Sequence, residues 1–279
     1  MSISEQIRAK AKELLEQGKV ECVIGYEKGS LPDVARPSFV YKADEVDNLI
    51  FDSLCSHNLT TYLPGLKGKS VAVVMKACDS RSLNVLVQEH QVERDKVYVI
   101  GVVCDGVKVE GKPQARCEAC AERVPANSDF LAGEPTAATA GSVDFADVVE
   151  LEGKSAAERM AYWHSQFDSC IRCFACRQTC PNCYCSECIA EQTMPEWVML
   201  PVDPLNNKMF HIIRAYHMAG RCVGCNECER ACPMGIPISL LNRKIAKDVR
   251  ELFGHVAGLS PDAEPPLATF RKEETLTKA

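Results

Sequence analysis

The order of apolar and polar residues predicts an α/β region in the first part of the chain. Residues 3–17 repeat apolar side chains at helical spacing, and residues 20–26 form an apolar run typical of a strand. Two further β-branched runs, at 70–75 and 96–103, indicate buried strands, and the stretch that follows Asp79 between them has helical periodicity. A strand–helix–strand unit of this kind predicts a small parallel sheet.

The second part of the chain has a helical pattern interrupted by loops. Residues 105–145 are rich in glycine, proline and alanine, which predicts a long loop or domain connection. Helices are expected at 155–168, at 206–219 and from about 238 to 253. The residues after Gly258 are polar and include proline, so we expect a tail that is extended or that lies over a partner.

Cysteine content changes this picture, because 17 of the 279 residues are cysteine. Eleven of these cysteines lie between Cys170 and Cys232. The sequence contains no run of about 18 apolar residues and no secretory signal, so we expect a cytoplasmic protein without a membrane span. In a reducing compartment, closely spaced cysteines indicate metal binding rather than disulfides. The net charge of −6, with no basic block, argues against a nucleic-acid partner.

Two cysteine runs in the C-terminal part have the same spacing. The first is Cys170-Ile-Arg-Cys173-Phe-Ala-Cys176-Arg-Gln-Thr-Cys180-Pro181. The second is Cys222-Val-Gly-Cys225-Asn-Glu-Cys228-Glu-Arg-Ala-Cys232-Pro233. Both match C-x2-C-x2-C-x3-C-P, the bacterial two-cluster ferredoxin pattern, in which the fourth cysteine of each run binds the other cluster.

Carried over to this chain, the pattern assigns two [4Fe-4S] clusters. The ligands of the first cluster are Cys170, Cys173, Cys176 and Cys232, and those of the second are Cys222, Cys225, Cys228 and Cys180. The alternative is structural zinc, which uses four ligands in two pairs rather than two runs of four that end in proline. Iron–sulfur clusters are therefore favoured, and their cysteine ligation leaves no open position for catalysis.

Four cysteines of the N-terminal part predict a further [4Fe-4S] cluster. Cys78 and Cys104 follow two adjacent expected strands, at the edge where α/β proteins place their sites, and Cys117 and Cys120 form a C-x2-C pair soon after. The alternative is two core cysteines and a small zinc pair, and Cys55 is a rival ligand.

The insertion between the two runs holds three closely spaced cysteines. Cys183, Cys185 and Cys188 lie within six residues, which is unusual for core cysteines. They could bind a further cluster or zinc with a fourth ligand from elsewhere, or they could pack around the ferredoxin-type fold.

The expected fold is an α/β N-terminal domain with a small parallel sheet, followed by an α-rich, two-[4Fe-4S], bacterial ferredoxin-like domain. We divide the chain into an α/β domain with a cluster site, a connecting segment, a dicluster domain with a cysteine-rich insertion, and a polar tail. Their bounds are residues 1–125, 126–160, 161–256 and 257–279, respectively.

Several segments carry a resemblance to a known family. Residues 73–83 (Val-Val-Met-Lys-Ala-Cys-Asp-Ser-Arg-Ser-Leu), residues 100–104 (Ile-Gly-Val-Val-Cys) and the two cysteine runs resemble the beta subunits of deazaflavin-coenzyme-reducing hydrogenases and formate dehydrogenases. Residues 210–237 with Leu240-Leu241-Asn242 are similar to a short branch associated with heterodisulfide-reductase-like complexes of anaerobes. The resemblance implies FAD, two ferredoxin-type clusters and one further cluster near the flavin.

Two departures from that family favour a relay over a flavoenzyme. The ferredoxin-type part follows the α/β part instead of preceding it, and residues 1–70 show no glycine-rich segment for flavin. We therefore expect an electron-transfer subunit that passes single electrons between a flavin-containing partner and a catalytic subunit. That subunit would be a heterodisulfide-reductase-, hydrogenase- or dehydrogenase-like protein. The alternative is a flavin-binding subunit that exchanges hydride with a soluble coenzyme, and a redox sensor or scaffold is a third hypothesis.

Overall fold

The first half of the computed structural model is built on a five-stranded sheet with the order β2-β1-β3-β4-β7. The structure describes residues 1–266 apart from 110, 119, 121 and 136–144. The strands of this sheet are β1 (Cys22–Lys28), β2 (Ala35–Val40), β3 (Val71–Met75), β4 (Val97–Val102) and β7 (Phe130–Ala132). A separate two-stranded ribbon consists of β5 (Lys108–Val109) and β6 (Lys112–Pro113).

The sheet is mixed, which refines the predicted parallel sheet. β1, β3, β4 and β7 are parallel, whereas β2 pairs antiparallel with β1, with Val23 opposite Val40. β2 follows β1 after only six residues, and a connection this short permits only antiparallel pairing. Pro37 is tolerated there because β2 is an edge strand. The predicted α/β character of this region is confirmed.

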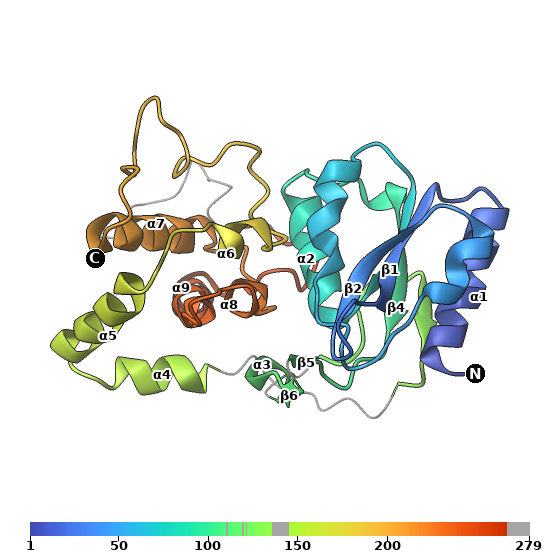
Figure 1. Cartoon of the computed structure of the whole chain (residues 1–279), viewed down its shortest axis with the longest axis horizontal. Coiled ribbons are helices and arrows are strands. Elements are labelled where there is room, and N and C mark those ends of the chain that lie inside the picture. The colour runs from blue at the N-terminus through green and yellow to red at the C-terminus, as the bar shows by residue number, and fades with distance from the viewer. Residues whose placement is uncertain (110, 119, 121, 136–144, 267–279) are drawn as a thin grey trace.

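Helices cover both sides of the sheet. α1 (Ile3–Glu16) begins at a capping box of Ser2 and Glu5 and buries Ile7, Ala11 and Leu14 against the strands. α2 (Ala77–Gln88) lies on the other side, between the sheet and the cysteine-rich part (Figure 1). All five residues of β3 are buried, as expected for a strand enclosed on both faces.

The segment expected as one long loop or connection contains regular structure. β5, β6, α3 (Ala115–Glu118) and β7 lie within 105–145, so the loop prediction is wrong at these positions. β7 extends the sheet beyond β4, and α4 (Ala146–Glu152) follows within the predicted connecting segment 126–160. The prediction failed here because β7 is three residues long and its pairing with β4 is tertiary.

The second half consists of helices around the two cysteine runs. Its elements are α5 (Ala156–Asp168), α6 (Ala175–Gln178), α7 (Pro204–His217), α8 (Glu227–Arg230) and α9 (Ile238–Phe253). The three helices expected in this region are confirmed within two residues at each end. Three 3₁₀ helices in the first half complete the list: η1 (Ala43–Asn48), η2 (Leu59–Leu66) and η3 (Arg94–Lys96). None of these described helices is long and apolar enough to cross a membrane.

The start of the C-terminal tail packs on α2 of the same chain. Arg81 donates to the carbonyl oxygen of Ala257 through Nε and Nη2, at 3.1 and 2.7 Å, and Asn84 donates to the carbonyl oxygen of Gly258 at 2.8 Å. A Cβ at Gly258 would lie 2.2 Å from the Arg81 carbonyl oxygen, so only glycine fits this approach. The tail was expected to be extended or to lie over a partner. Its first residues lie on the α/β part of the same chain, and residues 267–279 fall outside the described residues.

Candidate metal centres

The four thiols predicted for the second cluster surround one cavity. Cys180 comes from the first cysteine run, and the other three come from the second run and the start of α8. These cavity-lining cysteines are Cys180, Cys222, Cys225 and Cys228. One run therefore contributes three thiols and the other contributes the fourth, which is the exchange that the ferredoxin spacing predicts.

The four thiols predicted for the first cluster also lie near one another. Burial and, to a smaller extent, the neighbouring thiols of Cys170, Cys232 and Cys173 raise the pKa of Cys176 to about 11, against the effect of Arg214. The backbone N–H of Arg172 donates to the Cys170 sulfur at 3.3 Å, and the His211 Nε2 atom lies 3.3 Å from the same sulfur. Cys173 is exposed, so this group of thiols reaches the protein surface.

The two runs fold into matching tight loops. Arg172 and Gly224, two residues after the first cysteine of each run, have φ angles of +47° and +69°. Phe174 and Asn226, four residues after the first cysteine of each run, have φ angles of +59° and +67°. Left-handed backbone at three non-glycine residues costs about 1–2 kcal/mol each, and such strain concentrates at functional sites. The loops turn backbone N–H groups toward the sulfurs, a geometry that suits anionic thiolates.

A buried guanidinium lies between the two groups of thiols. Arg214 of α7 is 4% exposed and donates through Nη2 to the carbonyl oxygen of Cys176 at 3.0 Å. Burial lowers its pKa, but the nearby thiols of Cys180, Cys228 and Cys176 raise it well above the usual range. Among the described residues Arg214 has no carboxylate partner, and its buried Nε has no hydrogen-bond acceptor. A buried charge of this kind is costly unless an anion compensates it. A [4Fe-4S] cluster with four thiolate ligands is such an anion, so the donor set and its surroundings fit this group.

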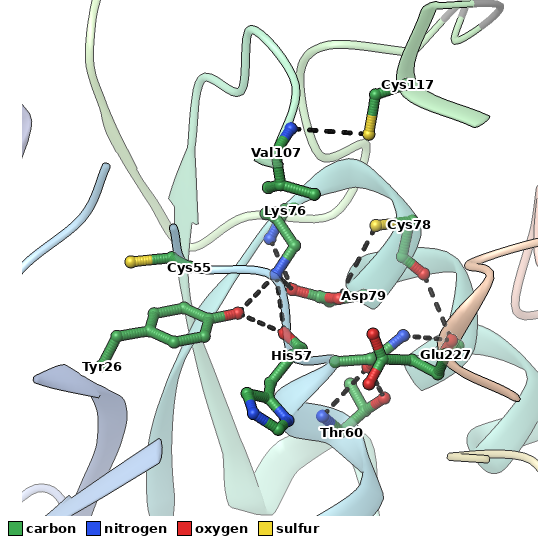
Figure 2. Close-up of polar contacts among 12 residues, drawn as sticks. Tyr26, Cys55, His57, Thr60, Lys76, Cys78, Asp79, Val107, Cys117 and Glu227 are labelled. Atoms are coloured by element: carbon green, nitrogen blue, oxygen red, sulfur yellow. Dashed lines mark hydrogen bonds and ion pairs between the residues drawn. The ribbon is translucent and has the colours of Figure 1, made fainter. Parts of the chain in front are cut away.

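The four N-terminal cysteines predicted for a third cluster line a cavity of their own. Cys78 stands at the first turn of α2, directly after β3, and Cys104 follows β4, so both lie at the carboxyl edge of the sheet. Cys117 of α3 and Cys120, just after that helix, face them, and the Val107 N–H lies 3.5 Å from the Cys117 sulfur (Figure 2). This cavity is also lined by Cys225 of the second cysteine run.

Cations surround this third cavity. Lys76, Arg116 and Arg123 line it, whereas Glu122 is the carboxylate among the described lining residues. Lys76 is 3% exposed, and its Nζ lies 3.0 Å from Asp79 Oδ2, donates to the His57 carbonyl oxygen at 2.8 Å and contacts the Tyr26 hydroxyl (Figure 2). Burial lowers the pKa of Lys76, but the charges of Asp79, Tyr26 and Cys78 raise it well above its usual value. An excess of fixed positive charge suits an anionic group held by four thiolates.

The thiols are arranged around cavities rather than around a point. Within the described part of the chain, no three His, Cys, Asp or Glu side chains converge closely enough to bind a single metal ion. Zinc needs its sulfur ligands about 2.3 Å from one ion, whereas a cubane cluster binds each thiolate at a different iron. The ferredoxin-type spacing of the two cysteine runs favours the larger group over the zinc alternative.

Other predicted ligands do not form a comparable group. Cys55 lies in the hydrophobic core with its sulfur near the Ile50 carbonyl oxygen, and burial raises its pKa to about 12. Figure 2 shows its sulfur directed away from Cys78, so the structure does not bring this rival ligand to the third cavity. In the insertion, Cys183 lies near Cys180 and Cys188, whereas Cys185 is exposed. A metal role for the insertion stays a prediction.

Several residues near the thiols were not predicted from the sequence. Asn242 of α9 donates to the Cys228 sulfur at 3.6 Å, as His211 of α7 contacts Cys170. The carboxylate of Asp79, at the third position of α2, accepts from the Lys76 N–H at 3.0 Å and caps the helix. The helical periodicity places Asn242 and His211 on buried helix faces, but it cannot indicate that these faces meet a sulfur.

Comparisons with known proteins agree with this arrangement. A family model described as a 4Fe-4S dicluster domain matches residues 169–237, which include both cysteine runs. The chain is 22% identical to the F420-dependent formate dehydrogenase subunit beta of Methanocaldococcus jannaschii, over 95% of this chain and 94% of the relative. It is 26% identical to the F420-dependent formate dehydrogenase 1 subunit beta of Methanococcus maripaludis, over 94% of this chain and 92% of that protein. The resemblance to the beta-subunit family and the iron–sulfur, electron-transport character are confirmed.

Proposed function

We propose that this relative of formate dehydrogenase beta subunits is an electron relay with three [4Fe-4S] clusters. It would pass single electrons between a flavin-containing partner and a catalytic subunit of the formate dehydrogenase, hydrogenase or heterodisulfide reductase type. The cofactor of this chain is iron–sulfur, and the flavin belongs to the partner. When bound, a [4Fe-4S] cluster supplies reversible one-electron oxidation and reduction.

One observation carries this proposal. Cys225, a predicted ligand of the second cluster, lines the cavity of Cys78, Cys104, Cys117 and Cys120. The thiols of the α/β part and those of the dicluster part are therefore neighbours. Cys228 in turn lies close to Cys176 of the first group. The three groups form a continuous series across the molecule, which is what a relay requires.

The residues around the thiols have supporting roles. Arg214 compensates negative charge between the first and second groups, and Lys76, Arg116 and Arg123 do so at the third cavity. The backbone N–H of Arg172 and the side-chain amide of Asn242 donate to sulfurs, and the His211 Nε2 atom contacts one. Such hydrogen bonds and charges set the potentials of iron–sulfur centres.

The test is anaerobic purification of the full chain at native expression level, followed by iron, sulfide and flavin analysis. A relay should contain about twelve iron atoms per chain, or about eight if the third group is empty, with little flavin. It should co-purify with a larger flavin- or cluster-containing protein and, alone, reduce only artificial dyes. Stoichiometric flavin with turnover of a physiological coenzyme by the isolated chain would instead establish the flavoenzyme alternative. One zinc with little iron would refute both.

A further inference from the structure

Helices α4, α5, α7 and α9 lie at the end of the molecule away from the sheet (Figure 1), and a groove opens between their side chains. It has a volume of about 490 Å³ and mainly apolar walls, which include Val148, Leu151, Met160, Trp163, Ile212 and Leu241. Met160 is 56% exposed in this position. Apolar surface that is open to solvent and rimmed by polar residues is typical of an interaction site.

A series of stacked rings connects the groove to the first group of thiols. Trp163 stacks on Phe167 with ring centroids 5.4 Å apart and planes 20° apart. Phe167 stacks on His211 at 4.8 Å and 11°. The Nε2 atom of His211 then contacts the Cys170 sulfur at 3.3 Å. Both Trp163 and Phe167 line the groove. The three stacked rings therefore lead from the groove wall to Cys170, a predicted cluster ligand.

The rim of the groove is positively charged. Arg159, Lys208 and Lys244 line it, against Glu152 as the carboxylate among the described lining residues. Lys244 pairs with Glu152 and Asp248, and Arg159 donates to the Glu152 carbonyl oxygen, whereas Lys208 has no ion-pair partner in the described part of the chain. This local excess contrasts with the net charge of −6 of the whole chain. A complementary partner is therefore acidic around an apolar centre.

These charges argue against two other occupants. Residues 267–279 carry Arg271, Lys272 and Lys278 against two glutamates, so they offer no excess of negative charge to the rim. A second copy that met this one groove to groove would oppose like charges.

We infer that the groove binds an apolar segment flanked by Asp or Glu on a redox partner protein with its own one-electron centre. This inference rests on the proposed relay function. The third cavity faces the α/β part at one end of the thiol series, and the groove opens beside the first group at the other. One electron crosses in each event, so the centre on one side is oxidised as the centre on the other is reduced.

Site-specific photo-crosslinking in the full chain, within the natively expressed complex, tests this inference. A photo-reactive residue replaces Met160 in the groove. The matched control replaces Leu31, which is 64% exposed and lies just before the edge strand β2 in the α/β part. Mass spectrometry identifies the linked peptide. We expect position 160, but not position 31, to link to an apolar, acid-flanked peptide of a protein with bound flavin or iron–sulfur cluster. The inference would be overturned if position 160 linked to residues 267–279 or to a second copy of the chain. It would also be overturned if position 160 formed no crosslink in a complex that still assembles.

A charge reversal provides a second readout. Lys208→Glu should weaken binding of the crosslinked partner about tenfold at low salt and less at high salt, with unchanged iron content. Undiminished binding would count against the groove. Failure of the proposed function itself has a different signature, because the unmodified chain would then lack iron or co-purify with no redox protein, and the inference would fall with it.

Discussion

Cys225 lines the same cavity as Cys78, although the two cysteines belong to different halves of the chain. Burial raises the pKa of Cys225 well above its usual value, and the thiol of Cys78 is among the neighbours that raise it further. The α/β part and the dicluster part therefore meet at their thiols. In a relay, this contact determines which two centres exchange electrons directly.

The third group of thiols can be tested by removing one of its members. Cys104→Ala should lower the iron content by about four atoms per chain, which is one cubane cluster. The EPR signals of the two ferredoxin-type centres should persist, because Cys104 belongs to neither cysteine run and does not line the cavity of the second group of thiols. Iron analysis and low-temperature EPR of the reduced protein measure both effects.

Cys22→Ala is the matched control for this variant. Cys22 is another cysteine of the α/β part, but it is buried in β1 within the hydrophobic core. Its loss should leave the iron content unchanged. An unchanged iron content in Cys104→Ala as well would remove Cys104 from the ligand set.

The elements that the sequence predicted are those with a strong local signal. α9 agrees with the prediction at both ends because its apolar stripe is long and Gly254, with a φ angle of +65°, ends it. β2 and β7 were missed. β2 contains Pro37 and alternates exposed positions, and β7 is short, so both depend on pairing with strands distant in sequence.

The candidate metal centres likewise contain features that the sequence predicts and features that it does not. The spacing of the two cysteine runs predicts which thiols share a cavity, because the loop of each run is local and its pattern is specific. The buried charges of Lys76 and Arg214 could not be predicted, since a lysine or arginine in a helical or strand pattern is normally solvated. Their roles appear only when distant elements meet.

Asn242 provides a test of how the protein sets a potential. Its Nδ2 donates to the Cys228 sulfur at 3.6 Å, and an N–H dipole stabilises the more negative, reduced state of a cluster. Asn242→Leu should therefore lower the reduction potential of the centre that Cys228 holds, without loss of iron. An EPR-monitored redox titration measures this shift. The centre held by Cys170 serves as an internal control, and equal shifts of both centres would contradict a local role for Asn242.

The connection between α2 and the second cysteine run should contribute to stability. Glu89 accepts from Arg221 Nε at 2.7 Å and Nη2 at 2.9 Å, and from the Tyr184 hydroxyl at 2.7 Å. Glu89→Gln removes the charge from this bidentate pair. Because the Arg221 side chain is 30% exposed, we expect a loss of about 1–2 kcal/mol in the free energy of unfolding. Urea unfolding under anaerobic conditions measures it. Glu93→Gln, at an exposed glutamate nearby, should have no effect, and equal losses in both variants would refute the link.

The buried pair of Lys76 and Asp79 should show strong energetic coupling. The two side chains are 3% and 0% exposed, and Lys76 Nζ lies 3.0 Å from Asp79 Oδ2. Lys76→Met keeps most of the side-chain volume but leaves the carboxylate buried without its cation, which costs about 3–5 kcal/mol. The double variant with Asp79→Asn removes both charges and should recover most of this loss. Urea unfolding of the two single variants and the double variant measures the coupling energy. If the double variant is as unstable as the sum of the single variants, the pair does not stabilise the site as a unit, and packing around Tyr26 must account for the buried lysine.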